Sequence, residues 1–340
     1  MENVTIKEIA EHAGVSMKTV SRVLNDEPNV KPLTRDKVRE AAKALNYRPN
    51  FSARRLASRK SFIIAHFHDN PNPDYLEKLH QGIHQACRTA RYFSVMEPLP
   101  YPYAMAAADY LGQFKIDGVI LSPPLCDDIE LLDVLTQANI PFVRISPRTE
   151  RHLSSSSYID DKRAVCRMTH RLIDMGHEKI AFIAGPDEHK VSFLRQDGFM
   201  KALKEADINL ENCPIVQGGF TVRSGTEICQ KLIKNNPNIT AIFAANDDMA
   251  VGAIMGANKA GLKVPEDLSV IGFDGSRIGD VIWPALTTIC QPAKAMALAA
   301  AELLLAEISD PELEKRNVEF DVDLLMRGTT ITRSDNVLNN

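Results

Sequence analysis

The chain has 340 residues with 40 Lys/Arg and 44 Asp/Glu, a formal net charge of −4, and this length predicts more than one domain with a large core. The charge is unevenly divided: residues 1–60 hold 13 Lys/Arg and 7 Asp/Glu, net +6, whereas residues 61–340 hold 27 and 37, net −10. This asymmetry excludes a uniformly basic nucleic-acid-coating protein and indicates that only the N-terminal part contacts a polyanion such as DNA.

Several other classes of protein find no support in the sequence. The six scattered cysteines form no C-x-x-C pair, so neither a zinc nor a redox motif is indicated, and reduced thiols are expected. The longest apolar run, residues 295–306, is interrupted by Glu302 and is too short to cross a bilayer, and the N-terminus has no apolar signal core. We therefore expect a cytoplasmic, soluble protein that does not contact a membrane.

Residues 4–25 predict a helix-turn-helix. The first helix has one apolar face, formed by Ile6, Ile9, Ala10 and Ala13. Gly14 can adopt the left-handed conformation that ends this helix. Ser16 is placed to cap a second helix, whose apolar face is Val20, Val23 and Leu24.

The second helix would direct Met17, Lys18, Ser21 and Arg22 outward, which suits a recognition helix in a major groove. An ordinary helical hairpin is the alternative. A third helix is expected over residues 34–45, capped by Thr34. Residues 50–59 predict a helix too short to be stable alone, and we interpret them as a linker that orders only when something holds it.

Strand and helix patterns alternate after Lys60, which favours parallel sheets of the doubly wound type. The predicted strands are Phe62–Phe67, Phe93–Met96, Gly118–Leu121, Phe142–Ile145, Ile180–Ala184, Ile215–Gln217, Ala241–Ala244 and Val270–Phe273. The predicted helices include Leu76–Thr89, Lys162–Met175, Gly198–Ala206, Thr221–Lys234, Met249–Ala260 and Ala293–Ile308. Eight strands exceed one comfortable sheet, so we expect two sub-domains divided near residues 157–161, with Ser154–Ser157 as an exposed loop.

Polar side chains follow several of these strands, where ligands bind in open parallel sheets. They include Asp69 and Asn70, Ser122, Ser146, Asn246 and Asp247, and Asp274. Together with an arginine and an aromatic ring, such residues can hold a polyhydroxylated ligand. Asn246 or Asp247 could instead merely cap a helix, and Asp274 could merely fix a turn before Gly275.

The chain resembles the lactose-repressor (LacI/GalR) family of bacterial transcription regulators. The resemblance is carried by the helix-turn-helix and by the stretches Pro28-Asn29-Val30, Thr34–Val38, Leu45–Asn50 and Ala53-Arg54-Arg55-Leu56, and the rest of the chain fits the family end to end. It implies an all-α headpiece (residues 1–47), a hinge (48–60), an α/β body (61–334) and a tail (335–340). The body would resemble a type I periplasmic binding protein of two doubly wound lobes, roughly 61–160 plus 292–320 and 161–291 plus 321–334.

The resemblance also implies residues for DNA binding. Short polar side chains would contact phosphates, namely Thr5, Ser16, Thr19, Ser21, Asn25, Asn29, Thr34 and Tyr47. Met17, Lys18 and Arg22 would read bases, although Lys18 could instead contact a phosphate. In the hinge, Asn50 and Ala53 would accompany Leu56, which would enter the minor groove beside its dimer mate and kink the DNA. Two-fold symmetry then implies a pseudo-palindromic operator.

The same resemblance assigns effector-binding residues. These are Asp69, Tyr75, Ser122, Asp161, Arg195, Phe220, Asn246, Asp274 and Trp283. Arg195 would be the family's effector-binding arginine, Phe220 would stack on the ligand, and Trp283 would border the cleft. Alternatively, Arg195 is a surface charge and Phe220 is plain core. The chain departs from the family pattern at Met296, His66, His68 and Pro123-Pro124, which leaves the exact effector open.

The sequence thus predicts a homodimeric repressor of carbohydrate-utilisation genes, controlled by a sugar-like effector that either releases or strengthens DNA binding. A regulator that answers to a nucleoside or purine is the alternative, as is a solute-binding protein without a regulatory role. Arg144 and Arg148 would be useful if the effector is anionic. No enzyme motif is present, and His80 and His84 lack a third metal ligand, so neither catalysis, a cofactor nor a metal is expected.

Overall fold

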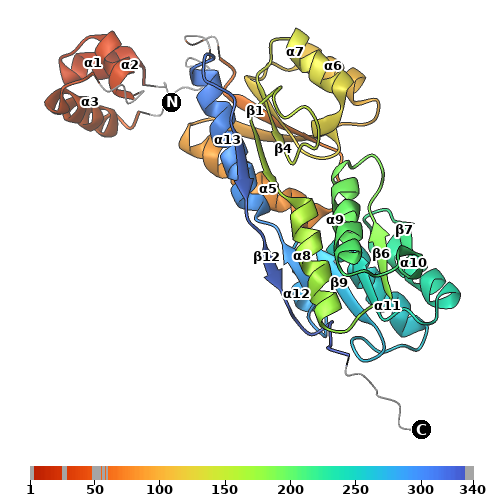
Figure 1. The fold of residues 1–340 in the computed structure, drawn as a ribbon. Coiled ribbons are helices and arrows are strands. Elements are labelled where there is room, and N and C mark those ends of the chain that lie inside the picture. The colour runs from red at the N-terminus through yellow and green to blue at the C-terminus, as the bar shows by residue number, and fades with distance from the viewer. Residues whose placement is uncertain (1–3, 25–28, 48–54, 56–57, 59, 334–340) are drawn as a thin grey trace, which may run out of the picture. The chain divides into compact units, whose positions relative to one another are not determined.

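The computed structural model describes residues 4–24, 29–47, 55, 58 and 60–333. The chain divides into two compact units, Met1–Ser61 and Phe62–Asn340, which we call the headpiece and the body. The described part of the headpiece is helical, and the body contains two β-sheets with helices packed on them (Figure 1). The expected fold class, a helical headpiece with a two-lobed α/β body, is therefore confirmed.

Three helices build the headpiece: α1 (Ile6–Ala13), α2 (Met17–Leu24) and α3 (Pro32–Ala44). They enclose a small core of buried residues, namely Ile9, Ala10, Val20, Val23, Val38 and Ala41. Thr5 and Glu8 form a reciprocal capping box at the start of α1, and Gly14 ends that helix with φ of 66°. The prediction for Thr34 is wrong: α3 begins two residues earlier, because Pro32 occupies the first helical position.

Lobe 1 of the body contains a six-stranded, fully parallel sheet in the order β11-β5-β4-β3-β1-β2. Its strands are β1 (Ile63–His68), β2 (Phe93–Pro98), β3 (Gly118–Leu121), β4 (Phe142–Ile145), β5 (Ser156–Ile159) and β11 (Asn317–Phe320). Its helices are α5 (Pro73–Thr89), α6 (Tyr103–Gln113), α7 (Ile129–Gln137) and α13 (Ala293–Ser309), with a short 3-10 turn over Leu125–Asp127.

Lobe 2 contains the second sheet, in the order β12-β10-β9-β8-β6-β7, with only β12 antiparallel to its neighbour. Its strands are β6 (Ile180–Ala184), β7 (Ile215–Gln217), β8 (Ala241–Ala244), β9 (Ser269–Phe273), β10 (Thr287–Cys290) and β12 (Asp323–Leu325). Its helices are α8 (Asp161–Asp174), α9 (Val191–Glu205), α10 (Val222–Asn235), α11 (Asp247–Lys259) and α12 (Arg277–Val281), with a 3-10 turn over Leu210–Asn212.

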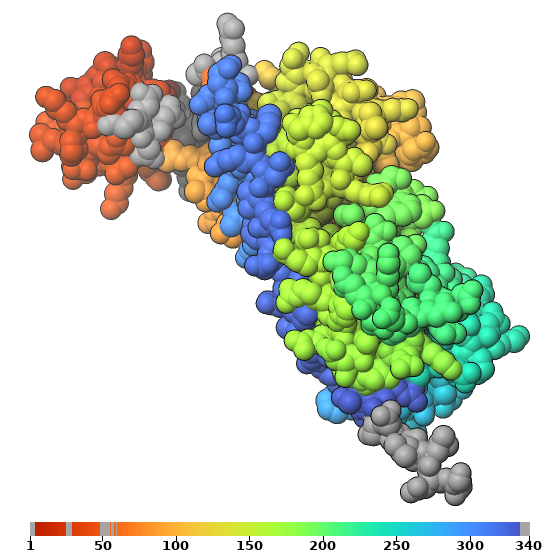
Figure 2. Space-filling model, in the orientation of Figure 1, coloured from red at the N-terminus to blue at the C-terminus, as the bar shows by residue number. Residues whose placement is uncertain are grey.

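The chain passes between the lobes three times: from β5 to α8, from β10 to α13, and from β11 to β12. Helix α13 therefore packs beside α5 in lobe 1, although more than 200 residues separate them in the sequence (Figure 1). Figure 2 shows the blue C-terminal part of the body lying along both lobes. These three connections give the lobes a shared border at which a ligand can be enclosed.

In lobe 2, helices α10 and α11 pack with their backbones in close approach. A side chain at Gly252 of α11 would overlap the backbone of Val222 and Thr226 on α10. Glycine therefore sets the spacing of these two helices. The close packing fixes the N-terminus of α11, which faces the ligand cavity described below.

Four strands, β5, β10, β11 and β12, were not predicted, and the expected exposed loop at Ser154–Ser157 is wrong. All four of these serines are buried, and β5 begins at Ser156. Their hydroxyls find partners inside the lobe: Ser156 Oγ lies 2.6 Å from Asn317 Oδ1, and Arg144 Nε donates to Ser154 Oγ at 2.9 Å. Polar residues can occupy a buried strand because these bonds replace those with water.

Within the described residues, no helix is both long and apolar enough to span a membrane.

Candidate nucleic-acid interface and ligand cavity

Helix α2 presents a polar face opposite its buried side. Val20 and Val23 are buried in the headpiece core, whereas Met17 is 57% exposed and Lys18 is also exposed. The Thr19 amide donates to Ser16 Oγ at 3.1 Å, so Ser16 caps α2 as predicted. The N-terminal turn of α2 therefore offers its side chains to a partner, which is the geometry of a recognition helix.

The other predicted DNA-binding residues lie around this helix in varied surroundings. Thr5 and Asn29 are exposed, whereas Thr19, Ser21, Arg22, Thr34 and Tyr47 are half-buried. Arg22 Nη2 reaches the Asn29 carbonyl oxygen at 3.5 Å. Asn25, Asn50, Ala53 and Leu56 lie outside the described residues, so their roles stay predictions.

The body contains a cavity whose walls come from both lobes. It is lined by Asn70, Asn72, Tyr75, Pro123, Ser146, His189, Val191, Arg195, Phe220, Asn246, Asp274 and Gln291. Its empty space is about 420 Å³, including the part open to solvent. Most of the lining residues follow the carboxyl ends of strands, where ligands bind in open parallel sheets.

A buried charge cluster forms one wall of this cavity. Arg195 of α9 is 6% exposed, and its Nε donates to Asp161 Oδ1 at 2.8 Å. Its Nη1 donates to the Ala245 carbonyl at 2.6 Å and lies 3.8 Å from Asp274 Oδ1. The guanidinium also lies over the Phe273 ring, 3.6 Å from its centroid. Arg195 is thus held rigidly at the cavity, and the alternative of a surface charge is wrong.

Burial dominates the protonation of the carboxyls beside Arg195. It raises the pKa of Asp274 to about 7, although the Arg195 charge acts in the opposite direction. It also raises the pKa of Asp161, again against Arg195. Gln291 Nε2 donates to Asp274 Oδ1 at 2.7 Å. Two carboxyls therefore lie within 4 Å of the one guanidinium, and burial favours the neutral form of each.

An amide and two aromatic rings also line the cavity. Asn246 Oδ1 accepts from the Met249 amide at 2.9 Å, so Asn246 caps α11, while its Nδ2 donates to the Phe220 carbonyl at 3.1 Å. Phe220 has φ of 55° and packs edge-on against His189, with ring centroids 5.1 Å apart. Burial, with help from Arg195, lowers the pKa of His189 to about 4, which keeps this ring neutral at pH 7. This part of the lining is therefore uncharged at pH 7 and able to hydrogen-bond.

Asp247 has a structural role beside the cavity. It is fully buried, and its two oxygens accept hydrogen bonds from the Ser276 amide and hydroxyl and from the Thr288 hydroxyl. It therefore joins the start of α11 to β10 and to the turn after β9. Burial raises the pKa of Asp247 to about 6.

Four predicted effector residues do not line the cavity. Asp69 is exposed and accepts from the Tyr103 hydroxyl at 2.8 Å. Ser122 is buried behind the cavity, where its hydroxyl lies 3.0 Å from His66 Nε2. Asp161 accepts from Arg195 and is not among the lining residues. Trp283 is 93% exposed and is not among them either, so its place on the border of the cleft stays a prediction.

The sequence reasoning also missed cavity residues. Asn72, His189 and Val191 were not singled out. Asn72 could have been found because its side chain caps α5 directly after β1, accepting from the Tyr75 amide at 3.1 Å. His189 and Val191 lie where α9 begins, and nothing in their local sequence marks them.

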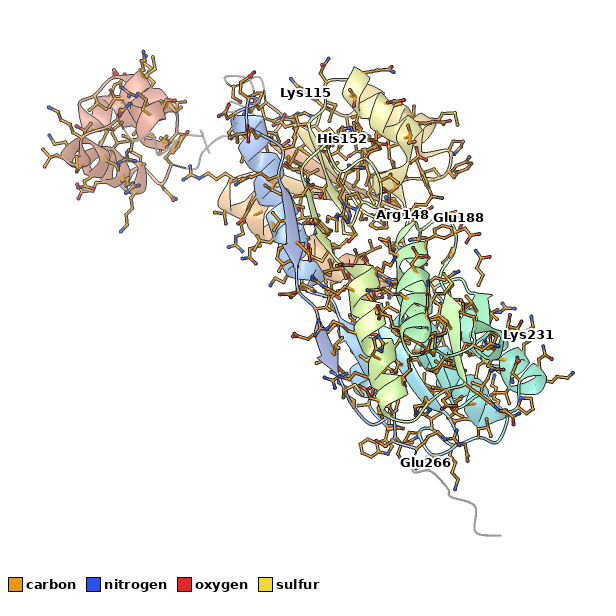
Figure 3. All side chains as sticks on the ribbon, viewed as in Figure 1. Lys115, Arg148, His152, Glu188, Lys231 and Glu266 are labelled. Carbon is orange, nitrogen blue, oxygen red and sulfur yellow. The ribbon has the colours of Figure 1, made fainter. Side chains whose placement is uncertain are left out.

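Arg144 and Arg148 both lie away from the cavity lining. Arg144 is fully buried and donates to Ser154 Oγ and to the carbonyls of Cys126, Thr149 and Glu150. Arg148 is exposed, and its guanidinium lies 5.1 Å from the centroid of the Phe193 ring on α9. Figure 3 labels Arg148 on lobe 1 and Glu188 on lobe 2. Arg148 therefore joins the lobes without entering the cavity.

Lys78 of α5 makes a second link between the lobes. Its Nζ donates to the Gly275 carbonyl at 2.7 Å, next to Asp274. Contacts of this kind would change if the lobes moved relative to one another when a ligand binds.

Family models match both units. Residues 5–50 match the model described as bacterial regulatory proteins, lacI family, and residues 169–330 match a periplasmic binding protein-like domain. Catabolite control protein A of Priestia megaterium is 33% identical over 332 residues, which are 96% of this chain and 99% of that protein.

Solved structures of other proteins are similar in fold to this chain over nearly its whole length. A complex of the transcriptional regulator CelR with cellobiose has a TM-score of 0.74 at 29% identity, covering 96% of this chain and 100% of that one. The lac repressor dimer bound to operator and the anti-inducer ONPF has a TM-score of 0.79 at 28% identity, covering 97% and 100%.

Proposed function

This chain belongs to the lacI family of bacterial regulatory proteins, and from that membership we propose that it is a DNA-binding repressor of carbohydrate-utilisation genes. It binds a pseudo-palindromic operator as a homodimer in the cytoplasm, and a neutral sugar in the body cavity controls its affinity for DNA. It catalyses no reaction. The observation that carries the choice of ligand is the composition of the cavity wall.

The headpiece supports the DNA-binding part of the proposal. Helix α2 offers the exposed Met17 and Lys18 and the half-buried Arg22 for base contacts, and the net charge of +6 over residues 1–60 attracts the phosphates. The net charge of −10 on the rest of the chain repels DNA, so the body does not compete with the headpiece for it.

The charge of the cavity favours an uncharged ligand over an anionic one. Among the described residues that line it, Arg195 is the only arginine or lysine, and its guanidinium is already paired with Asp161 and lies near Asp274. A phosphate or carboxylate would have to compete with these carboxyls for Arg195. A sugar would meet no such cost, because its hydroxyls can donate to Asp274 and Asn246 and accept from Arg195.

The aromatic residues suit one face of a pyranose ring. Phe220 and Tyr75 line the cavity beside the hydrogen-bonding groups, so an apolar ring face has a surface to cover. The CelR structure holds cellobiose, which supports a carbohydrate for this chain as well. The same rings, with the amides of Asn72 and Asn246, would also accept a planar base, which favours a nucleoside or purine as the second candidate.

Dimer formation fits a surface of lobe 2. Val281 is 79% exposed and Trp283 is 93% exposed. Two large apolar side chains this close in sequence and this exposed are typical of a protein–protein contact. The lac repressor relative is a dimer on its operator, and a dimer presents two headpieces to two half-sites.

The test is a thermal-shift screen of the purified protein against monosaccharides, oligosaccharides, sugar phosphates, nucleosides and purines. A ligand that binds only the native state raises the unfolding temperature by mass action. We expect a neutral sugar to do so, and we expect the shift to be lost in Asn246→Ala and Asp274→Ala. Glu302→Ala, an exposed change on α13 of lobe 1, is the control that should keep the shift.

Each outcome decides between ligands. A hit from nucleosides or purines that disappears in both variants would replace the sugar with the second candidate. A shift from sugar phosphates but not from the free sugars would contradict the charge argument. A sugar hit that both variants retain would move the site away from this cavity.

A further inference from the structure

Helices α8 and α9 of lobe 2 pack side by side and bring three metal-binding side chains together. Cys166 and His170 lie four residues apart on α8, so they share one helix face. Glu205 is the last residue of α9, on the neighbouring helix. Their ligand atoms all lie within 4.8 Å of one another, and among the residues described in the structure no other group of three does so.

The distances between these atoms are close to those around a tetrahedral ion. His170 Nε2 lies 2.9 Å from Glu205 Oε2, and Cys166 Sγ lies 3.5 Å from the same oxygen. Zinc bonds of ~2.0–2.3 Å place tetrahedral ligand atoms ~3.3–3.7 Å apart. The third pair, Cys166 Sγ and His170 Nε2 or Nδ1, lies within 4.8 Å, so one ion could contact all three residues after the side chains adjust.

The surroundings suit a bound ion that can exchange with solvent. Cys166 is buried at the base of the cluster, whereas the side chains of His170 and Glu205 are 36% and 45% exposed. Lys201 Nζ lies 3.4 Å from Glu205 Oε1, the other carboxylate oxygen, so Lys201 orients the carboxylate and leaves Oε2 available. The path to solvent lies on the side of His170 and Glu205.

We propose that Cys166, His170 and Glu205 bind a zinc ion, with water as the fourth ligand. The donor set of one thiolate, one imidazole and one carboxylate favours zinc over calcium or magnesium, which prefer oxygen ligands. Binding releases the Cys166 proton to solvent, because only the thiolate binds the metal. The ion links α8 to α9 and stabilises lobe 2. This site is separate from the sugar cavity and does not depend on the proposed function.

The sequence did not reveal this site because its third member is distant. The motif is Cys-x-x-x-His on one helix, and Glu205 follows 35 residues after His170. His80 and His84 have the same spacing on α5 and stack with centroids 5.9 Å apart, but no third ligand joins them within the described residues.

The experiment uses the full-length protein, reduced and freed of metal, titrated with zinc in competition with a coloured chelator and separately with cobalt(II). We expect one zinc per chain, a thiolate-to-cobalt absorption band, and a higher unfolding temperature with zinc. His170→Ala and Glu205→Gln should each weaken zinc binding at least about tenfold, and Cys166→Ser should abolish the cobalt band. Cys290→Ser removes a half-buried thiol elsewhere in lobe 2 and should change neither result.

The proposal is overturned if the wild-type protein binds no zinc at micromolar concentration. It is also overturned if His170→Ala and Glu205→Gln bind zinc as tightly as the wild type. Glu205 lies on the surface at the end of α9, so Glu205→Gln should not disturb folding, and its loss of zinc binding can be assigned to the missing carboxylate. The metal-free unfolding temperature of each variant checks that it is folded.

Discussion

Replacing Arg195 with methionine leaves a buried carboxylate without its partner. Asp161 is 2% exposed, and its only charged hydrogen-bond donor among the described residues is Arg195 Nε at 2.8 Å. Methionine fills a similar volume without a charge, so the loss of stability reports the isolated carboxylate more than a cavity. We expect Arg195→Met to be strongly destabilising.

The size of the loss follows from the protonation of Asp161. A buried carboxyl with no partner takes up a proton, and holding it neutral at pH 7 against an unfolded pKa of about 3.9 costs about 4 kcal/mol. Burial already raises the pKa of Asp161 beside Arg195, so part of this cost is present in the wild type and about 4 kcal/mol is the upper bound of the loss. This bound falls to about 1.5 kcal/mol at pH 5, because the unfolded carboxyl is itself closer to protonation there.

Urea unfolding of the body at pH 7 and pH 5 measures both quantities. The double variant Arg195→Met/Asp161→Asn removes both charges and should lose less than the sum of the two single variants. Arg223→Met breaks an exposed pair with Glu227 and should change stability little. The reasoning is refuted if Arg195→Met behaves like Arg223→Met, or if its loss is the same at both pH values.

Three further predictions concern other parts of the molecule. If Lys18 contacts a base, Lys18→Ala should weaken operator binding by about 1–3 kcal/mol and relax the preference at one base pair in a binding-site selection. A loss of affinity that is uniform over all sequences would instead make Lys18 a phosphate contact. Gly185→Ala should weaken ligand binding, because a methyl group there overlaps the Phe220 ring, whereas Gly112→Ala in α6 meets open space and should leave binding unchanged. Calorimetric titration with the ligand measures both affinities, and equal values would contradict the placement of Phe220. Burial, with the charges of His68 and His80, lowers the pKa of His66 to about 3, so His66 stays neutral in the native state while the unfolded chain takes up a proton near pH 6.5. The free energy of unfolding should therefore fall, as the pH falls from about 6.5 to about 3, by up to about 1.4 kcal/mol per pH unit. His66→Gln should reduce the slope of unfolding free energy against pH by the equivalent of about one proton, and an unchanged slope would contradict this prediction.

The headpiece and the apolar strands could be predicted from local sequence because their physical signals are local. Gly14 has the left-handed conformation expected of it, and Ser16 caps α2 through the Thr19 amide. Strands β3, β4, β6, β7 and β8 begin and end where the apolar runs do, since buried parallel strands are nearly continuous in hydrophobicity.

The missed elements depend on contacts between distant parts of the chain. Strand β5 is rich in serine, and it is stable inside lobe 1 only because Asn317 and the Arg316 amide, some 160 residues later, bond to Ser156 and Ser155. The local sequence pattern therefore predicted an exposed loop in this segment. The same reason explains β11 and β12, whose strands follow crossings between lobes that no local signal announces.

The residues of the cavity likewise divide into those that the sequence could predict and those whose position depends on the folded chain. Arg195, Asn246 and Asp274 could be predicted from strand ends and family resemblance, and the cavity brings them together. Trp283 was expected to border the cleft because the family resemblance placed it there, yet it is almost fully exposed on lobe 2 and is not among the lining residues. Which face a side chain takes after a strand depends on the turn geometry, here the short helix α12 and the chain after it, and sequence spacing does not specify it.

The central claim is that ligand binding in the cavity controls the affinity of the headpiece for operator DNA. The most direct test is the dissociation constant for an operator obtained by binding-site selection, measured with and without a saturating amount of the sugar from the thermal-shift screen at one fixed salt concentration. The account predicts a change of about 5- to 150-fold in either direction, absent in Asn246→Ala. An operator affinity that is the same with and without saturating sugar would contradict it.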